Sequence, residues 1–115
     1  MGDDADAGPP PEPPAPADMR LIDVLQALAD PNRLQMLRVL ADDGWHSCGL
    51  ETWGLDLQKS TVSHHLKTLR EAGLVEYRIR GRNKDGRLRR EVVEARFPGL
   101  LAGVLSPEAA SDLER

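Results

Sequence analysis

The chain has 115 residues, a formal net charge of −4, a single cysteine and few aromatic side chains. This length corresponds to one small domain, and one cysteine excludes an internal disulfide, as is usual in the reducing cytoplasm. No stretch is long and apolar enough to predict a transmembrane helix or a signal peptide, so we expect a cytoplasmic protein that has no membrane partner.

The first segment, residues 1–18, is rich in proline, alanine, glycine and aspartate and holds no basic side chain. Such a composition has little apolar surface to bury, and it predicts a disordered acidic tail. We expect a folded domain over residues 19–106. Residues 107–115 are predicted to form a short C-terminal helix or a frayed tail.

Two helices are predicted after the tail. Leu21, Leu25 and Leu28 recur at helical spacing, and Asp30–Pro31 then supplies an N-cap and a first-turn proline for the second helix. A turn at 42–44 ends that helix. Residues 45–57 are predicted to begin as a loop and to continue as a short buried helix.

The most informative stretch is the helix predicted from Lys59 to Gly73. Val62, Leu66 and Leu69 share one face, and Gly73 is a typical C-terminal stop. The opposite face carries hydroxyls, an imidazole and ammonium groups, which can read base edges and bind phosphates. This is the pattern of the recognition helix of a helix-turn-helix. The predicted DNA contacts are Lys59, Ser60, Thr61, Ser63, His64 and Lys67.

A β-hairpin is predicted next, because Val75, Tyr77 and Ile79 alternate with charged residues. We expect a turn over residues 81–86 and a returning strand over residues 88–93. Residues 59–90 contain ten basic and three acidic side chains, a local excess of +7 that favours a polyanionic partner. The hairpin would be a DNA-binding wing, with phosphate contacts from Arg78, Arg80, Arg82, Lys84 and Arg87.

An apolar helix is predicted over residues 95–105, despite Pro98 and Gly99. Its apolar surface exceeds what one small domain needs, so the first and last helices are expected to pair across a two-fold axis. The predicted fold is therefore mainly α with a two-stranded β-hairpin: a dimeric winged helix-turn-helix of the ααααββα type.

Residues 28–37 (LADPNRLQML) and 60–75 (STVSHHLKTLREAGLV) resemble the ArsR/SmtB family of bacterial transcriptional regulators. The resemblance extends over roughly residues 20–105. It implies a winged-helix homodimer with its terminal helices at the interface. It also implies an operator near a promoter and an inducer that changes DNA affinity.

The inducer is where the chain departs from the family. Metal-sensing members often carry Cys-x-Cys before the recognition helix, or His and acidic ligands on the terminal helix. Here the first region holds one thiol, and residues 95–115 hold no histidine. His46, Cys48 and Glu51 could form part of a Zn²⁺ or Ni²⁺ site. Alternatively, Cys48 is a redox sensor, or simply a free, partly buried cysteine.

These features predict a sequence-specific DNA-binding transcriptional regulator of ArsR type, with repression expected and activation left open. It would bind double-stranded DNA as a homodimer on an inverted-repeat operator, with a metal or redox response left open. The alternative is a protein-interaction subunit that regulates transcription only with a co-regulator or sensor partner. No phosphate loop or paired-carboxylate cleft accompanies Cys48, so an enzyme is not expected.

Overall fold

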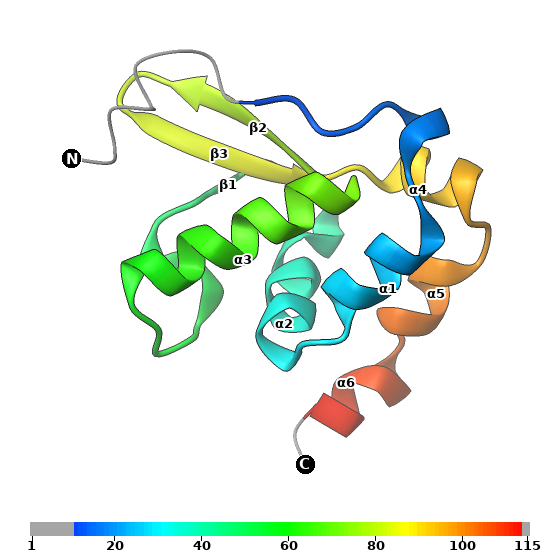
Figure 1. Ribbon diagram of the computed structural model, residues 1–115. Helices are drawn as coiled ribbons and strands as arrows, with labels where there is room; N and C mark the ends of the chain where they lie inside the picture. Colours follow the sequence, from blue (N-terminus) through cyan, green and yellow to red (C-terminus); the bar gives the residue numbers. More distant parts are fainter. Residues whose placement is uncertain (1–10, 114–115) are drawn as a thin grey trace.

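The computed structural model describes residues 11–113 (Figure 1). Its helices are α1 (Leu21–Leu28), α2 (Pro31–Val39), α3 (Lys59–Ala72), α4 (Arg90–Arg96), α5 (Leu100–Val104) and α6 (Pro107–Leu113). Short 3-10 helices are η2 (Pro16–Asp18), η3 (Leu40–Asp42) and η4 (Leu50–Trp53). The strands are β1 (His46–Ser47), β2 (Val75–Arg80) and β3 (Asn83–Leu88).

The helices pack beneath one face of a small antiparallel sheet whose strand order is β1-β3-β2 (Figure 1). α3 runs alongside the β2–β3 hairpin, and the start of α3 and the hairpin tip lie on the same side of the molecule. The core beneath the sheet contains one large aromatic residue, Trp53, surrounded by aliphatic side chains. Its fully buried members include Met36, Leu37, Leu40, Leu69, Leu74, Val75, Val93 and Leu101.

The second helix begins where the sequence predicts. Asp30 is the N-cap of α2, and its Oδ1 accepts hydrogen bonds from the backbone N–H of Asn32 at 2.8 Å and of Arg33 at 3.1 Å. Pro31 occupies the first helical position, where no N–H is needed. These bonds satisfy two of the helix's free amide groups, so the boundary between α1 and α2 is set locally.

The third helix also has the predicted extent, ending at Gly73 in the left-handed region with φ +95°. The backbone N–H of Leu74 donates to Leu69 O at 3.0 Å, and that of Gly73 donates to Arg70 O at 2.9 Å. This is a Schellman ending. A Cβ at Gly73 would lie 2.7 Å from Cγ of Met19, so the position requires glycine for space as well as for φ.

The sheet differs from the two-stranded prediction because a third strand joins it. β1 pairs with β3, with His46 opposite Gly86 and Ser47 opposite Asp85. From the sequence, residues 46–49 were predicted to form a loop and a helix start. A strand of two residues is too short to show an alternating pattern in the sequence. It can be recognised only from its pairing with β3.

The returning strand was predicted over residues 88–93, and this was wrong. β3 covers Asn83–Leu88, the turn is Gly81–Arg82, and α4 begins at Arg90. Asn83 to Arg87 resemble a polar loop in sequence. They form a strand because charged side chains on β2 lie directly opposite and pair with them.

The single apolar helix predicted over residues 95–105 is divided in the structure. α4 ends at Arg96, Gly99 has φ +87°, and α5 begins at Leu100. Pro98 lacks the N–H that would continue a helix and restricts the residue before it, so the break is placed by the chain's own residues.

Residues 1–10 of the predicted tail lie outside the described residues, and residues 11–18 lead into the domain. Nη1 of Arg89 donates to Pro14 O at 3.2 Å and to Gly73 O at 2.9 Å. Met19 is buried, and its carbonyl accepts a bond from Arg96. Among the described residues, we find no helix with the length and apolarity needed to cross a membrane.

Candidate nucleic-acid interface

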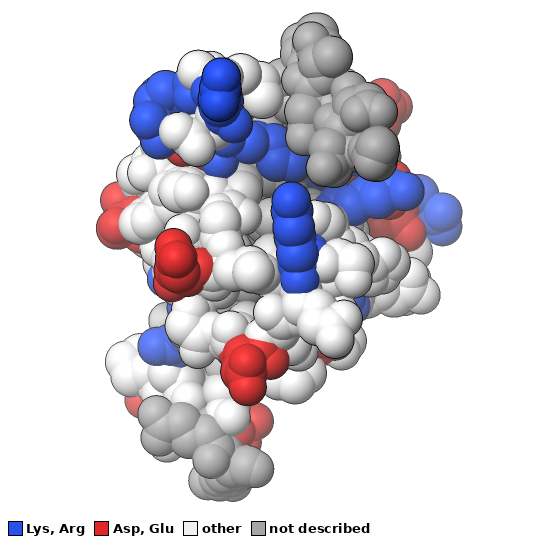
Figure 2. Space-filling view, turned by 90° about the vertical axis from the view of Figure 1, so that its left-hand side faces the viewer, with Lys and Arg blue, Asp and Glu red and all other residues white. Residues whose placement is uncertain are grey.

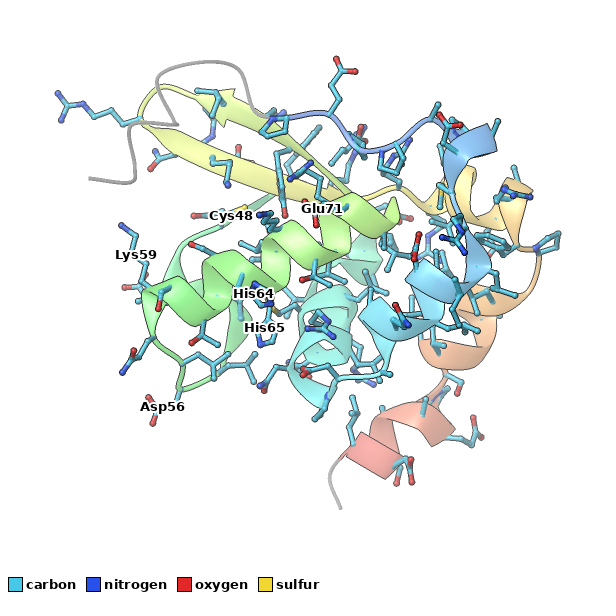
Figure 3. The ribbon with its side chains drawn as sticks, viewed as in Figure 1. Cys48, Asp56, Lys59, His64, His65 and Glu71 are labelled. Atoms are coloured by element: carbon cyan, nitrogen blue, oxygen red, sulfur yellow. The ribbon has the colours of Figure 1, made fainter. Side chains whose placement is uncertain are left out.

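The exposed face of α3 carries the side chains predicted to contact DNA. Lys59, Ser60, Ser63, His64 and Lys67 are exposed, and Thr61 is half-buried. Figure 3 shows Lys59 at the start of the helix, pointing away from the body of the protein. The helix buries its opposite face in the core. The structure therefore leaves five of the six predicted contact side chains exposed to solvent and the sixth, Thr61, partly so.

Arg33 ties α3 to the end of α1. Its Nε donates to Ala27 O at 2.6 Å and its Nη2 donates to Gln26 O at 3.2 Å. Nη1 lies 3.1 Å from Nδ1 of His65, which points from α3 toward α2 (Figure 3). One guanidinium on α2 thus connects the last turn of the first helix to the middle of the third.

This contact fixes the protonation state of His65. A guanidinium can only donate, so Nδ1 must accept and the ring proton must lie on Nε2. Burial lowers the pKa of His65, Asp30 opposes that shift, and Arg33 and His64 add to it. The neutral ring is therefore the form that holds α3 in this position.

Of the wing residues, Arg78, Arg80 and Arg82 are exposed, Lys84 and Arg87 are half-buried, and most of the five are already paired. Arg78 and Arg80 both donate to the buried carboxylate of Asp85, with Nε–Oδ2 distances of 3.1 Å and 2.9 Å. Arg87 donates to Glu76, with a shortest distance of 2.8 Å. The two arginines hold the pKa of Asp85 below its ordinary value, so the pairs stay ionised at neutral pH.

An aromatic side chain adds to this pairing. The guanidinium carbons of Arg78 and Arg87 each lie 4.4 Å from the ring centroid of Trp45. Cation–π contacts of this kind orient the guanidinium groups along the outer face of the sheet. The roles of Trp45, Asp85 and Arg33 were not predicted from the sequence. Trp45 directly precedes β1, which pairs with β3, and Asp85 lies opposite Arg78 in the β2–β3 pair. Nothing in the local pattern indicated Arg33.

Two wing cations remain available for phosphates. Arg82, in the hairpin turn, is exposed and makes no hydrogen bond or ion pair with the part of the chain that the structure describes. Nζ of Lys84 lies 4.6 Å from the ring centroid of Tyr77, and this contact leaves the ammonium group free to bind an anion. In Figure 2, Lys and Arg side chains gather over the upper part of the face that carries the hairpin tip.

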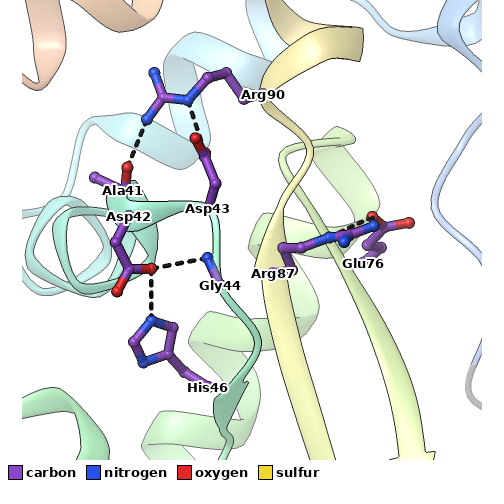
Figure 4. A network of polar contacts seen from close by, with 8 residues as sticks. All are labelled: Ala41, Asp42, Asp43, Gly44, His46, Glu76, Arg87 and Arg90. Carbon is purple, nitrogen blue, oxygen red and sulfur yellow. Dashed lines mark hydrogen bonds and ion pairs between the residues drawn. The ribbon is translucent and has the colours of Figure 1, made fainter.

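The predicted metal ligands His46, Cys48 and Glu51 do not converge on one point, and His46 is already paired with another residue. Nε2 of His46 is 2.8 Å from Oδ1 of Asp42, which also accepts from the backbone of Gly44 (Figure 4). Glu51 is exposed on η4. Over residues 11–113 no group of three or more His, Cys, Asp or Glu side chains is placed to hold a metal ion. The structure thus does not assemble His46, Cys48 and Glu51 into a site.

Cys48 lies between the sheet and α3 (Figure 3). Burial raises the pKa of its thiol to about 11, which Lys84 opposes and Asp85 reinforces. A thiol of this kind is almost entirely protonated at neutral pH, and the thiolate is the reactive form. The environment therefore favours the packed-cysteine interpretation over the redox-sensor interpretation.

Comparisons with known proteins agree with this geometry. Residues 30–77 match the family described as bacterial regulatory protein, arsR family. The chain is 39% identical over 79 residues to the uncharacterized HTH-type transcriptional regulator YceK of Bacillus subtilis, covering 68% of this chain and 79% of that protein. The chain belongs to the ArsR family.

Other ArsR relatives are similar over shorter stretches or in fold. The transcriptional repressor SmtB homolog of Synechocystis sp. is 39% identical over 64 residues, covering 56% of this chain and 48% of that protein. An ArsR-like transcriptional regulator from Rhodococcus sp. RHA1 superposes with a TM-score of 0.53 at 23% identity, covering 82% and 86% of the two chains. This ArsR protein is a DNA-binding transcriptional regulator and not an enzyme.

Proposed function

We propose that the protein is a sequence-specific repressor that binds an inverted-repeat operator as a homodimer. The observation that carries this is the exposed, carboxylate-poor face of α3 beside a wing with two available cations. Two copies of α3 would enter successive major grooves about 34 Å apart. Such a protein would work in the cytoplasm and repress by covering a promoter.

An unpartnered apolar face on α1 supports the dimer. Leu21, Ile22 and Leu25 are 47%, 48% and 43% exposed, while the other side of the same helix is buried. Three large aliphatic side chains on one short helix are costly to leave in water. A two-fold axis beside α1 would cover them and set the distance between the two recognition helices.

Salt dependence tests the wing. Each phosphate contact releases condensed counterions, so Arg82→Ala should lower the slope of log K against log [salt] by about one. Arg87→Ala should lower it less, because Arg87 already pairs with Glu76. Fluorescence anisotropy over a salt series with promoter fragments measures both. Equal slopes for wild type and Arg82→Ala would contradict the proposed wing contact.

Base recognition is tested separately on α3. His64→Ala should reduce the preference for operator over unrelated DNA, since base-edge contacts carry specificity. Arg82→Ala should weaken binding to both sequences alike. If the isolated dimer binds no promoter fragment until a second protein is added, the co-regulator alternative is favoured instead.

That a metal ion acts as the effector is still a prediction. Calorimetric titration of the metal-free protein with Zn²⁺ and with Ni²⁺ tests the site predicted from His46, Cys48 and Glu51. Stoichiometric binding that is lost in Cys48→Ser would support it, and the absence of binding heat would end it.

A further inference from the structure

A pocket of about 420 Å³ lies between α2, α6 and the turn that leads into α3. Figure 1 shows α6 below α2 at the end of the molecule away from the sheet. This volume is in the range of small-molecule sites in proteins. The residues that line it are Pro31, Asn32, Gln35, Arg38, Gly54, Leu55, Ala110 and Leu113.

Arg38 is the charged residue among these eight. Its Nη1 is buried and has no hydrogen-bond partner in the described part of the chain. A buried guanidinium N–H without an acceptor costs free energy, and native proteins rarely leave one in that state. The rest of the guanidinium makes no hydrogen bond with the described residues either, and Arg38 is half-buried where it lines the pocket. A carboxylate in the pocket could therefore approach the group from its accessible side.

The other lining residues define the rest of the ligand. The half-buried amide side chains of Asn32 and Gln35 make no hydrogen bond with the described residues, so they are available to a second polar atom. Leu55, Ala110 and Leu113 supply an apolar wall. A carboxylate would meet Arg38 in a charge-assisted bond, and a compact apolar body would cover the leucines.

We propose that this pocket binds an apolar carboxylic acid and that binding changes the affinity for DNA. Gly54 and Leu55 belong to the turn of the helix-turn-helix, a few residues before Lys59. Gly54 has φ +68°, so this turn has a defined backbone that a neighbouring ligand can stabilise or displace. A ligand seated here contacts the segment that sets the start of α3. The coupling rests on the proposed DNA-binding function.

The unpaired guanidinium of Arg38 makes a prediction about stability. Arg38→Met should raise the thermal unfolding midpoint of the free protein, because an unpaired partly buried charge is removed. Arg20→Met, at an exposed position outside the pocket, controls for the change in net charge. A midpoint lowered by Arg38→Met relative to that control would show a structural arginine and overturn the proposal.

Ligand binding is tested without DNA. The probes are 1-naphthoate and its uncharged match, 1-naphthamide, followed by amide NMR shifts of the full chain. Naphthoate should shift the amides of Gly54, Leu55 and Ala110, and naphthamide should bind far more weakly. Arg38→Gln should weaken naphthoate binding about ten- to a hundredfold, as expected for a lost charge-assisted bond. Arg20→Gln should leave it unchanged.

The two proposals fail separately. If benzoate, butyrate and naphthoate all leave these amides unshifted while the protein still binds its operator, the pocket assignment is wrong and the regulator proposal stands. If naphthoate binds through Arg38 but leaves the operator Kd unchanged, the coupling is wrong. Tight naphthoate binding by a protein that ignores all promoter DNA would support the pocket and contradict the regulator proposal.

Discussion

At the scale of single residues, the structure shows positions that serve two purposes. Gly73 ends α3 in the left-handed region and leaves room for Met19, which closes the core from the N-terminal side. Arg33 stabilises the end of α1 and donates a hydrogen bond to Nδ1 of His65. A substitution at such a position disturbs two elements at once.

Gly73→Ala should therefore destabilise the protein more than the same substitution at a left-handed glycine with open space around it. The strained φ and the 2.7 Å approach of Met19 Cγ together should cost about 2 to 4 kcal/mol. Gly54→Ala is the matched control, because Gly54 has φ +68° with nothing within 4 Å of a Cβ, and it should cost about 1 to 2 kcal/mol. Urea unfolding measures both, and equal costs would contradict the packing argument.

At the scale of elements, α3 depends on a neutral histidine. The pKa of His65 is lowered in the folded protein, so the unfolded chain, with a pKa of about 6.5, binds the proton more readily. Stability from this group is complete above about pH 6.5 and is lost as the pH falls toward the folded pKa.

His65→Asn keeps an acceptor for Arg33 and removes the titration. The free energy of unfolding should fall less steeply in this variant than in wild type between about pH 7 and pH 5. His64→Asn, at an exposed position on the same helix, should keep most of the wild-type slope, because it removes only the smallest contribution to the shift. Parallel pH curves for wild type and His65→Asn would show that the Arg33 contact does not depend on protonation.

The sequence predicted α2 and α3 because their signals are local: a capping aspartate, an apolar stripe and a terminal glycine. β1 and the true extent of β3 were not predictable in this way. Trp45, Asp85 and Arg87 are polar or isolated in sequence, and their structure comes from partners on other strands. The exposed residues of α3 were predicted, whereas the internal pairing of the wing arginines was not.

At the scale of the whole molecule, the exposed apolar face of α1 supports the proposed homodimer and gives a test of it. Leu25→Glu should convert the dimer into a monomer in sedimentation experiments and reduce operator affinity, because a charge would be placed in the predicted contact. Leu50→Glu, at a position 41% exposed on η4, is the control and should stay dimeric. If the Leu25→Glu protein remains dimeric, the dimer interface does not include this face of α1.

If the wing contacts DNA as proposed, the carboxylates of Asp85 and Glu76 affect how the protein would search the chromosome. Every stretch of duplex offers the same phosphates, so an unrestrained row of arginines would hold the protein wherever it landed. Asp85 and Glu76, each on the strand opposite its partners, offset two of the three positive charges of Arg78, Arg80 and Arg87. The wing would therefore hold arbitrary sequence mainly through Arg82, Lys84 and one remaining charge. Short residence on non-specific DNA would leave more of the protein molecules free to reach the operator.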